Sequence, residues 1–171
     1  MSRPEGAPWG DTEHAEVRRA GRADIAQLVE LRAQMLVAMG TDVGADGGRW
    51  RSTAADWFAR RLDEPASFAA FVAELPGGLL ASCAVGACEL RAPSPSNLFG
   101  VHGHVSNVCT MPGYRHRGYA RGCLVELIDW FARDTQALVL DLSATGDGVA
   151  LYRSLGFGPP RFEPMRLAFE R

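Results

Sequence analysis

The sequence contains no lysine, because all 18 of its basic residues are arginine. This absence excludes functions that need a lysine side chain, namely P-loop ATPases, protein kinases, Schiff-base chemistry with pyridoxal phosphate and S-x-x-K acyl-enzymes. Codon bias in a GC-rich genome is a sufficient explanation for the missing lysine. We therefore use it only to exclude functions.

The chain also lacks a strong net charge and a long apolar run. Its 18 basic and 20 acidic residues leave a net charge of −2, so no overall field attracts the molecule to nucleic acid or to an anionic membrane. No apolar run reaches the roughly 18 residues that span a bilayer, and the first residues lack the layout of a signal peptide. The sequence predicts a cytoplasmic protein that binds neither nucleic acid nor membrane.

Paired cysteines are absent as well. The sequence has no C-x-x-C motif and no histidine at metal-ligand spacing from a cysteine. We expect no metal site and four buried free thiols, at Cys83, Cys88, Cys109 and Cys123.

A length of 171 residues, 47% of them hydrophobic, suits one domain with its own core. Residues 1–15 combine proline, glycine and charge without periodicity, which predicts a mobile N-terminal tail. Residues 16–171 are predicted to form the domain.

The first part of that domain is predicted to hold a strand and two helices. Helical spacing of apolar residues and the positions of capping residues and proline set the boundaries. The expected segments are a strand at 16–19, a helix from Ala23 to Gly40, a loop over 40–48, and a helix that Ser52 or Thr53 caps and that ends before Pro65.

Strands and helices alternate in the remainder. The expected segments are strands at 67–75, 79–90 and 101–110, a helix from Gly118, a strand at 137–142, a helix over 147–155 and a final strand at 161–170. Pro76-Gly77-Gly78 predicts an antiparallel hairpin. The order β-α-α-β-β-β-α-β-α-β predicts an α/β (α+β) fold, a single-domain, mixed, mostly antiparallel sheet flanked by helices on both faces.

An arginine-rich turn, VCTMPGYRHRGYA at 108–120, connects a predicted strand to a helix. The first N–H groups of a helix lack partners and the helix dipole is positive there, so this position favours a phosphate. Gly118 lets the backbone approach a ligand, and Arg115, Arg117 and Arg121 supply charge. On these residues alone, a phosphate site and a capped helix with a solvated basic face both remain open.

The segment Arg115-x-x-Gly118-x-Ala120 resembles the R/Q-x-x-G-x-G/A signature of the GCN5-related N-acetyltransferases, the GNAT family. A second segment, ALYRSLGF at 150–157, is similar to the family's A-x-x-L-Y-x-x-x-G-F motif in a shortened form. The resemblance covers about residues 16–170, with its specific motifs in 104–157. It implies a GNAT-like fold.

The resemblance also implies that acetyl-CoA is the co-substrate. In such enzymes a splayed strand offers its free main-chain groups to the pantetheine arm, here at Val108, Cys109 and Thr110. The pyrophosphate is then held by the turn and the helix start, which correspond to Arg115, His116, Arg117, Gly118, Tyr119, Ala120 and Arg121.

Two catalytic residues follow from the same resemblance. Tyr152 matches the family tyrosine that can protonate the departing thiolate, although a tyrosine that only packs its ring is the alternative. The family base often lies eleven residues before the motif's arginine, which is the place of His104, and an imidazole suits a base at neutral pH. His102, Glu89 and a water chain remain alternatives.

One departure concerns the helix that carries Tyr152. Many relatives have asparagine seven residues before the tyrosine, whereas this chain has Thr145. A threonine hydroxyl can cap the helix but offers no amide to CoA. Ser143 is a partial substitute.

The resemblance places acceptor selectivity in the first two helices and the loop between them. Acids and aromatics there suit a cationic amine, while core tryptophans and solvated acids are the alternative. The residues in question are Asp42, Asp46, Trp50, Asp56 and Trp57.

We expect an acetyl-CoA-dependent N-acetyltransferase that moves acetyl directly to a primary amine of a small molecule, without an acyl-enzyme. A catalytically silent CoA-binding regulatory module and a protein or peptide N-acetyltransferase are the alternatives. A tRNA acceptor is disfavoured by the near-neutral charge. The resemblance allows a homodimer, although no pattern in the sequence identifies an interface.

Overall fold

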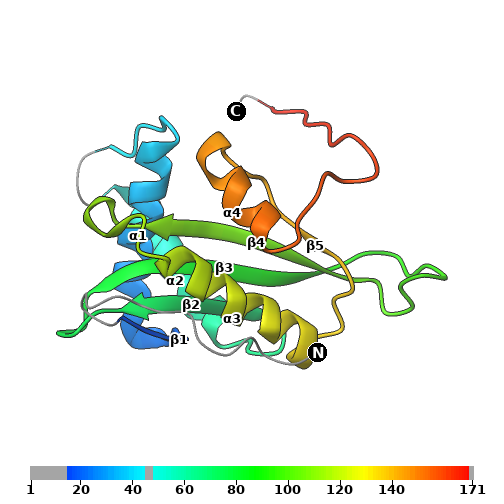
Figure 1. Cartoon of the computed structure of the whole chain (residues 1–171), viewed down its shortest axis with the longest axis horizontal. Helices are drawn as coiled ribbons and strands as arrows, with labels where there is room; N and C mark the ends of the chain where they lie inside the picture. Colours follow the sequence, from blue (N-terminus) through cyan, green and yellow to red (C-terminus); the bar gives the residue numbers. More distant parts are fainter. Residues whose placement is uncertain (1–14, 45–47, 170–171) are drawn as a thin grey trace.

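The computed structural model describes residues 15–44 and 48–169 and contains one five-stranded sheet, with helices on both faces (Figure 1). The strands are β1 (Glu16–Arg19), β2 (Phe68–Glu74), β3 (Leu80–Leu90), β4 (Val101–Thr110) and β5 (Leu140–Asp141). The helices are α1 (Ile25–Ala38), α2 (Arg49–Leu62), α3 (Tyr119–Asp134) and α4 (Val149–Ser154). Residues 1–14 of the predicted mobile tail lie outside the described residues.

The sheet has the order β1-β2-β3-β4-β5, with antiparallel pairing from β1 to β4 and parallel pairing of β4 with β5. The predicted hairpin joins β2 to β3, and Gly77 and Gly78 both take positive φ in its turn. Only glycine adopts these angles without strain. The predicted fold class, a mixed and mostly antiparallel sheet between helices, is confirmed.

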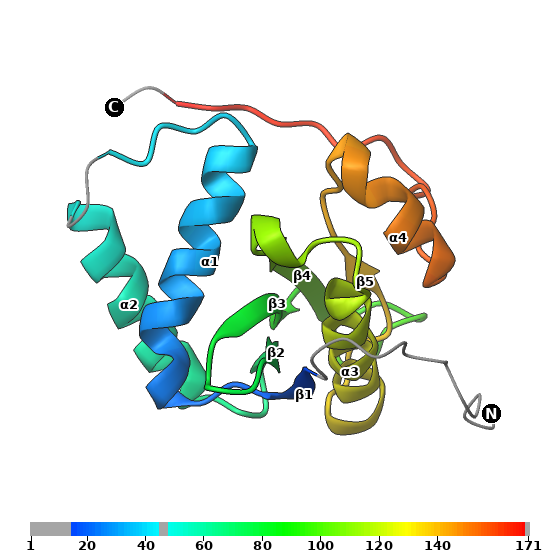
Figure 2. The same cartoon turned by 60° about the vertical axis from the view of Figure 1, so that its left-hand side comes forward.

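Each face of the sheet carries its own hydrophobic core. Helices α1 and α2 cover one face, where Leu28, Leu31 and Phe58 pack on Val72 and Val85. Helix α3 covers the other face, and its Leu124, Leu127 and Phe131 are fully buried. Figure 2 shows the two helical layers on opposite sides of the sheet.

Two glycines let α3 approach the sheet closely. A Cβ atom on Gly86 of β3 would lie 2.7 Å from Cε2 of Phe131, and one on Gly103 of β4 would lie 2.3 Å from Cδ2 of Leu140. Because both positions lack a side chain, the Phe131 ring fills the space beneath the β3–β4 pair.

An ion-pair network ties β1 to β2 and to the start of α1. Arg18 donates two hydrogen bonds of 2.8 Å to the Asp24 carboxylate and also pairs with Glu74. The amide of Gly21 donates to the same carboxylate at 2.8 Å. The adjacent Arg18 guanidinium lowers the pKa of Asp24 despite its burial.

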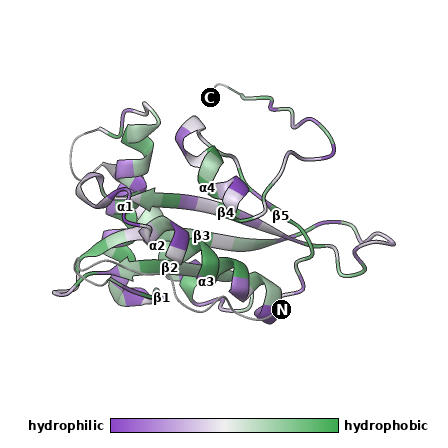
Figure 3. Cartoon of the chain, viewed as in Figure 1, coloured by the Kyte–Doolittle hydropathy of each residue, from purple (hydrophilic) through white to green (hydrophobic). Residues whose placement is uncertain are grey.

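The prediction of a final strand at 161–170 is wrong for its described residues, 161–169, which form no strand. An alternating pattern becomes a strand only when a neighbouring edge completes its hydrogen bonds, and this segment has no such neighbour among the described residues. Figure 3 shows the alternation along it. Its apolar side chains are 75 to 96% exposed, at Phe162, Met165, Leu167 and Phe169.

Two other expectations need correction. Helix α2 begins at Arg49, so Ser52 and Thr53 lie inside it rather than at its cap, and their hydroxyls donate to the Arg49 carbonyl at 2.9 and 3.0 Å. The strand expected at 137–142 is reduced to Leu140–Asp141.

Candidate active site

Strand β4 is paired with β3 along its length on one side, apart from a bulge, and is largely open on the other. Its register with β3 extends from Leu90–Val101 to Ser82–Thr110. Its register with β5 consists of Gly103–Leu140 and His104–Asp141. Beyond His104, no described strand pairs with this side of β4, so its main-chain groups there are free to bind a ligand.

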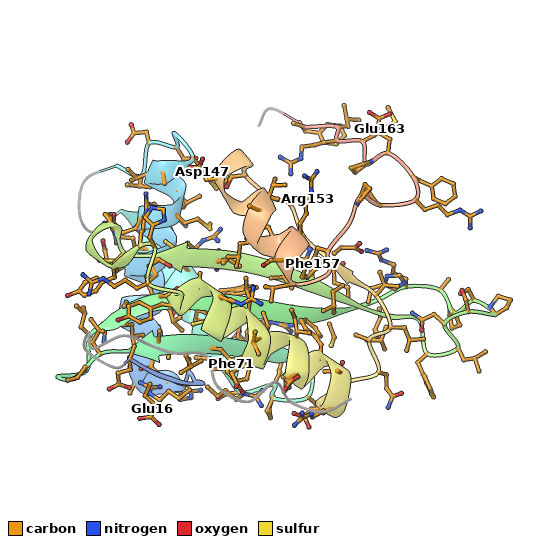
Figure 4. The ribbon with its side chains drawn as sticks, in the orientation of Figure 1. Glu16, Phe71, Asp147, Arg153, Phe157 and Glu163 are labelled. Atoms are coloured by element: carbon orange, nitrogen blue, oxygen red, sulfur yellow. The ribbon has the colours of Figure 1, made fainter. Side chains whose placement is uncertain are left out.

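A cleft of about 560 Å³ lies along this open side of β4. Its walls come from the end of α1, the turn that leads into α3, and the segment that leads into α4. Asp147 lines the cleft and lies at the end of α4 that faces α1, whereas Phe157 lies past the opposite end (Figure 4).

Seven of the site residues expected from the sequence meet in this cleft. They are Val108, Cys109, Thr110, Arg115, His116, Ala120 and Tyr152. The other expected residues lie outside its lining: His104, Arg117, Gly118, Tyr119 and Arg121. The open side of one strand and the two sequence motifs therefore face a common space.

The backbone of β4 is irregular where it borders the cleft. Asn107 takes a φ of 46°, and the register with β3 shifts between Cys83 and Val85, which makes a β-bulge. Ser82 secures the end of the strand, because its hydroxyl donates to the Cys109 carbonyl at 2.8 Å.

The turn between β4 and α3 brings backbone amides and arginines together. His116 and Gly118 take φ of 62° and 82°, and Gly118 is the N-cap of the 16-residue helix α3. Arg115 lies in the cleft with its Nε 3.4 Å from the Thr110 carbonyl oxygen. Arg117 lies over the Tyr114 ring. The backbone amides at the helix start, the helix dipole and Arg115 favour an anion here.

Arg121 has a different partner. Its Nη1 donates to the Ser154 hydroxyl at 2.7 Å, and that hydroxyl donates to the Leu151 carbonyl. Arg121 therefore links α3 to the end of α4.

Tyr152 reaches the cleft from α4 and is half-buried. Its ring packs edge-on against Phe157 with 6.0 Å between ring centroids, and a Cβ on Gly148 would lie 2.8 Å from its Cε2 atom. Burial raises the pKa of Tyr152. The hydroxyl therefore keeps its proton at neutral pH and can donate it.

The candidate bases lie on β3 and β4, outside the lining of the cleft. His104 precedes the first cleft-lining residue of β4 and faces Ala87 and Asp141 in the sheet register. His102 is paired with Glu89, and its Nδ1 is enclosed without a hydrogen-bond partner among the described residues. The Glu89 carboxylate lies 3.7 Å from Arg91.

The cleft also contains a thiol. Cys109 lines it, and burial raises its pKa to about 11. Burial likewise raises the pKa of Cys83 on the neighbouring strand. All four cysteines are free. Both of these thiols stay protonated at neutral pH and are poor nucleophiles.

The residues considered for acceptor binding lie elsewhere. The Trp50 indole donates to the Val43 carbonyl at 2.8 Å, and the Trp57 ring packs against Phe58 and Phe68. Asp42 and Asp56 are exposed outside the cleft lining, and Asp46 lies outside the described residues. Trp57 is 38% exposed and belongs to neither core, so its ring contacts at the surface of α2 explain it better than ligand binding in the cleft does.

Patterns in the sequence did not predict the contribution of α1 or of the bulge. Met35, Ala38 and Met39 form the α1 wall, and Ser106 and Asn107 complete the β4 side. The one signal in the sequence was an asparagine, a residue that tolerates left-handed backbone angles, inside a predicted strand. Thr145 lines the cleft, but its side chain makes no capping hydrogen bond to the short 3-10 helix Gly146–Gly148.

Within residues 15–44 and 48–169, no group of three or more histidine, cysteine, aspartate or glutamate side chains could hold a metal ion. None of the helices in the same two ranges is both long and apolar enough to cross a membrane.

Comparisons with known proteins agree with the fold. The family model described as "Acetyltransferase (GNAT) family" matches residues 40–157 of the chain. No curated protein sequence matches it.

Solved structures show the same architecture. The chain has a TM-score of 0.78 and 24% identity to a predicted acetyltransferase with acetyl-CoA from Clostridium acetobutylicum, covering 90% of this chain and 96% of that one. A GCN5-related N-acetyltransferase from Ralstonia eutropha gives a TM-score of 0.71 at 23% identity, covering 90% and 98%. Glucosamine-6-phosphate N-acetyltransferase from Arabidopsis thaliana gives 0.71 at 16% identity, covering 92% and 100%.

Proposed function

The chain belongs to the GNAT family of acetyltransferases, and from this premise we propose that it transfers acetyl from acetyl-CoA directly to a primary amine of a small molecule. One observation carries the proposal: the open side of β4, the arginine-rich turn at α3 and Tyr152 border a single cleft. The Clostridium structure, which contains acetyl-CoA, has a similar fold.

The pantetheine arm is proposed to lie along the open side of β4. The main-chain groups of Val108 to Thr110 that face away from β3 can pair with its two amides as a neighbouring strand would. The Cys109 carbonyl is not among them, because it already accepts from Ser82. This pairing needs only main-chain atoms, so the side chains of Val108 and Cys109 are free to pack.

The turn at the start of α3 is proposed to hold the pyrophosphate. The residues are the seven expected from the sequence motif, Arg115, His116, Arg117, Gly118, Tyr119, Ala120 and Arg121. Left-handed angles at His116 and Gly118 turn successive amides toward one side, as anion-binding loops require. Arg115 is placed best to add charge, whereas Arg121 already bonds to Ser154.

Tyr152 is proposed as the general acid. Its raised pKa keeps the hydroxyl protonated until a thiolate departs, and its position in the cleft lies opposite β4. No thiol of the chain needs to carry the acetyl group, because burial disfavours the Cys109 thiolate.

The amine must lose a proton before it attacks. His104 is the proposed base, acting directly or through water, because a neutral imidazole can accept a proton from the amine. His102, His104 and Ser106 alternate along β4, and Ser106 lines the cleft, so a proton path can run along this row. Glu89 and His102 remain the alternatives.

The test is an acetyl-CoA consumption screen against polyamines, amino acids, aminoglycosides and peptide N-termini, with mass spectrometry of the products. We expect an acetylated small amine. Acetylated peptides as sole product would favour a peptide acetyltransferase. Thermal protection by CoA with no acceptor consumed would favour a silent CoA-binding module.

A variant tests the acid. Tyr152→Phe should lower kcat about 100-fold, because a positioned general acid contributes that much or more. Tyr114→Phe, which keeps a ring beneath Arg117, is the matched control and should retain turnover. Full turnover in Tyr152→Phe would remove the proposed role.

A further inference from the structure

Asn107, in the β-bulge of β4, has a strained backbone conformation. Asn107 is 6% exposed and takes a left-handed φ of 46° in the middle of a strand. Asparagine is one of the few residues that tolerate this conformation, which still costs free energy in a regular sheet. Regular alternation would place Ser106 and Val108 on one face, but the bulge interrupts it, so that Val105 and Val108 pack in the same core, on the α3 side.

An arginine fixes the Asn107 side chain. Nη1 of Arg32, on α1, donates a hydrogen bond to Oδ1 of Asn107 across the two elements. A guanidinium has donors only, so the oxygen of the amide must face Arg32 and the NH₂ group must face away from it. The contact therefore settles the orientation of the amide.

The amide nitrogen is left without a partner. Nδ2 of Asn107 donates to no group in the described parts of the chain, although the residue lines the cleft. The main-chain oxygen of Asn107 is already engaged, since the Cys83 thiol donates to it at 3.0 Å. The remaining hydrogen-bonding capacity of this side chain is a donor available to a ligand in the cleft.

Arg32 also strengthens that donor. No carboxylate among residues 15–44 and 48–169 forms an ion pair with Arg32, so its charge acts mainly on the Asn107 oxygen. A cation on the amide oxygen polarises the group and makes its N–H bonds better donors. The nearby α1 wall is apolar, with Met35 and Ala38. The low dielectric of an apolar surrounding screens the charge of Arg32 weakly and so increases the effect.

We propose that Asn107, oriented by Arg32, donates a hydrogen bond from Nδ2 to the thioester carbonyl oxygen of acetyl-CoA and stabilises the negative charge that collects there. This inference rests on the proposed function. The bulge lies next to Val108–Thr110, where the pantetheine arm is proposed to run, and Tyr152 borders the same cleft. The acetyl methyl group would meet the apolar α1 wall.

The electron balance assigns each group one task. The amine lone pair forms the C–N bond, the carbonyl π pair moves onto the oxygen that Asn107 binds, and its return breaks the C–S bond. Sulfur leaves with the bonding pair and takes the proton of Tyr152, and the tyrosinate regains a proton from the nitrogen, directly or through water, as the amide forms. Asn107 exchanges no proton, and Arg32, which does not reach the reacting atoms, is a positioning residue.

Two substitutions at Asn107 isolate the donor. Asn107→Asp keeps an oxygen for Arg32 and tolerates the left-handed backbone, yet it removes the NH₂ group. Asn107→Gly keeps the backbone freedom and removes the whole side chain. In both variants kcat should fall 10²- to 10³-fold, as when one oxyanion donor is deleted, while the affinity for CoA and the melting temperature change little.

Arg32→Leu tests the positioning role. It should lower kcat about tenfold, less than the loss of Asn107 itself, and leave KM for acetyl-CoA nearly unchanged. Arg133→Leu, at an exposed arginine on α3, is the matched control and should keep full turnover. Equal losses of CoA affinity and of kcat in Arg32→Leu would indicate a merely structural contact and would overturn the positioning role.

A spectroscopic measurement makes the test independent of the acceptor. The carbonyl ¹³C resonance of bound [1-¹³C]acetyl-CoA should lie downfield of its free value in the wild type, because a hydrogen bond deshields that carbon. Asn107→Gly should remove most of this shift. An unchanged shift and an unchanged kcat in Asn107→Gly would overturn the inference alone, whereas a wild type that does not bind acetyl-CoA would overturn the proposed function.

Discussion

The two sides of β4 differ in a way that separates stability from ligand binding. Toward β3, the strand is paired from Val101 to Thr110, and the Phe131 ring packs beneath Gly86 and Gly103. Toward β5, pairing ends at His104 and a cleft of about 560 Å³ begins. On the β3 side, the main-chain hydrogen bonds of β4 stabilise the sheet. On the other side, the main-chain groups beyond His104 are available to a ligand.

This difference has a simple cause. Antiparallel β3 and β4 are long neighbours with apolar side chains on both faces, so pairing and burial reinforce each other. Strand β5 is short and the chain turns away from it toward α4. Splaying leaves main-chain groups unpaired, which a protein tolerates only where water or a ligand can satisfy them.

The largest expected effect is on the side of β4 that pairs with β3. Phe131→Ala should lower the free energy of unfolding by roughly 3 to 5 kcal/mol, because the fully buried ring leaves a cavity beneath two glycines. The same substitution at Phe162, which is 75% exposed, is the matched control and should change it by less than about 0.5 kcal/mol. Urea denaturation measures both. Similar losses in the two variants would contradict the exposed position of the C-terminal segment.

The second-largest effect concerns the Arg18–Asp24 pair at the β1 end of the sheet, whose contribution to the free energy of unfolding depends on pH. Arg18 lowers the pKa of Asp24, so the stabilisation from this pair is complete above the unfolded pKa of about 3.8 and disappears as the pH falls through the lower, folded pKa. Asp24→Asn should cost roughly 2 kcal/mol at pH 7, from the loss of hydrogen bonds to a charged group, and much less at pH 2.

The control for Asp24 is an exposed pair. Asp63 pairs with Arg22 at the surface, and Asp63→Asn should leave the free energy of unfolding nearly unchanged at either pH. Urea denaturation as a function of pH measures the difference. A pH-independent loss in Asp24→Asn would show that packing, rather than the carboxylate charge, is what the substitution removes.

The smallest effect concerns thiol reactivity on the open side. Because burial raises the pKa of Cys109 to about 11, its thiolate fraction is about a hundredfold lower than at the ordinary value of 9.0. Alkylation followed by mass spectrometry should find Cys109 slow, and acetyl-CoA should slow it further. Cys88, on the α3 face outside the cleft, is the control whose rate acetyl-CoA should not change.

Local sequence patterns predicted most elements. They failed where the structure of a segment depends on the elements that it pairs with or packs against. The strands at 67–75, 79–90 and 101–110 formed within a few residues of their expected bounds, because their apolar residues pack on both faces. The alternation at 161–169 is equally clear, yet it formed no strand. The cap at Ser52 was wrong because α2 begins at Arg49 after the N-cap Gly48, and the Ser52 hydroxyl donates back to the Arg49 carbonyl instead.

The candidate site shows the same division. The motifs at 115–120 and 150–157 predicted the turn and Tyr152, which border one cleft, because a strand–turn–helix junction and a helix-borne tyrosine are local features. Neither pattern indicated the α1 wall or the bond between Arg32 and Asn107, residues 75 positions apart. Long-range pairs of this kind leave no periodic signal.

By itself the sequence determined the fold class, the family and the residues of the two motifs, because these depend on periodicity, turn chemistry and short spacings. Only the tertiary structure decided that β4 and β5 part after His104, that Asn107 adopts a left-handed bulge, and that Arg32 reaches it. These features depend on which elements meet and in which register, and packing between distant segments sets both.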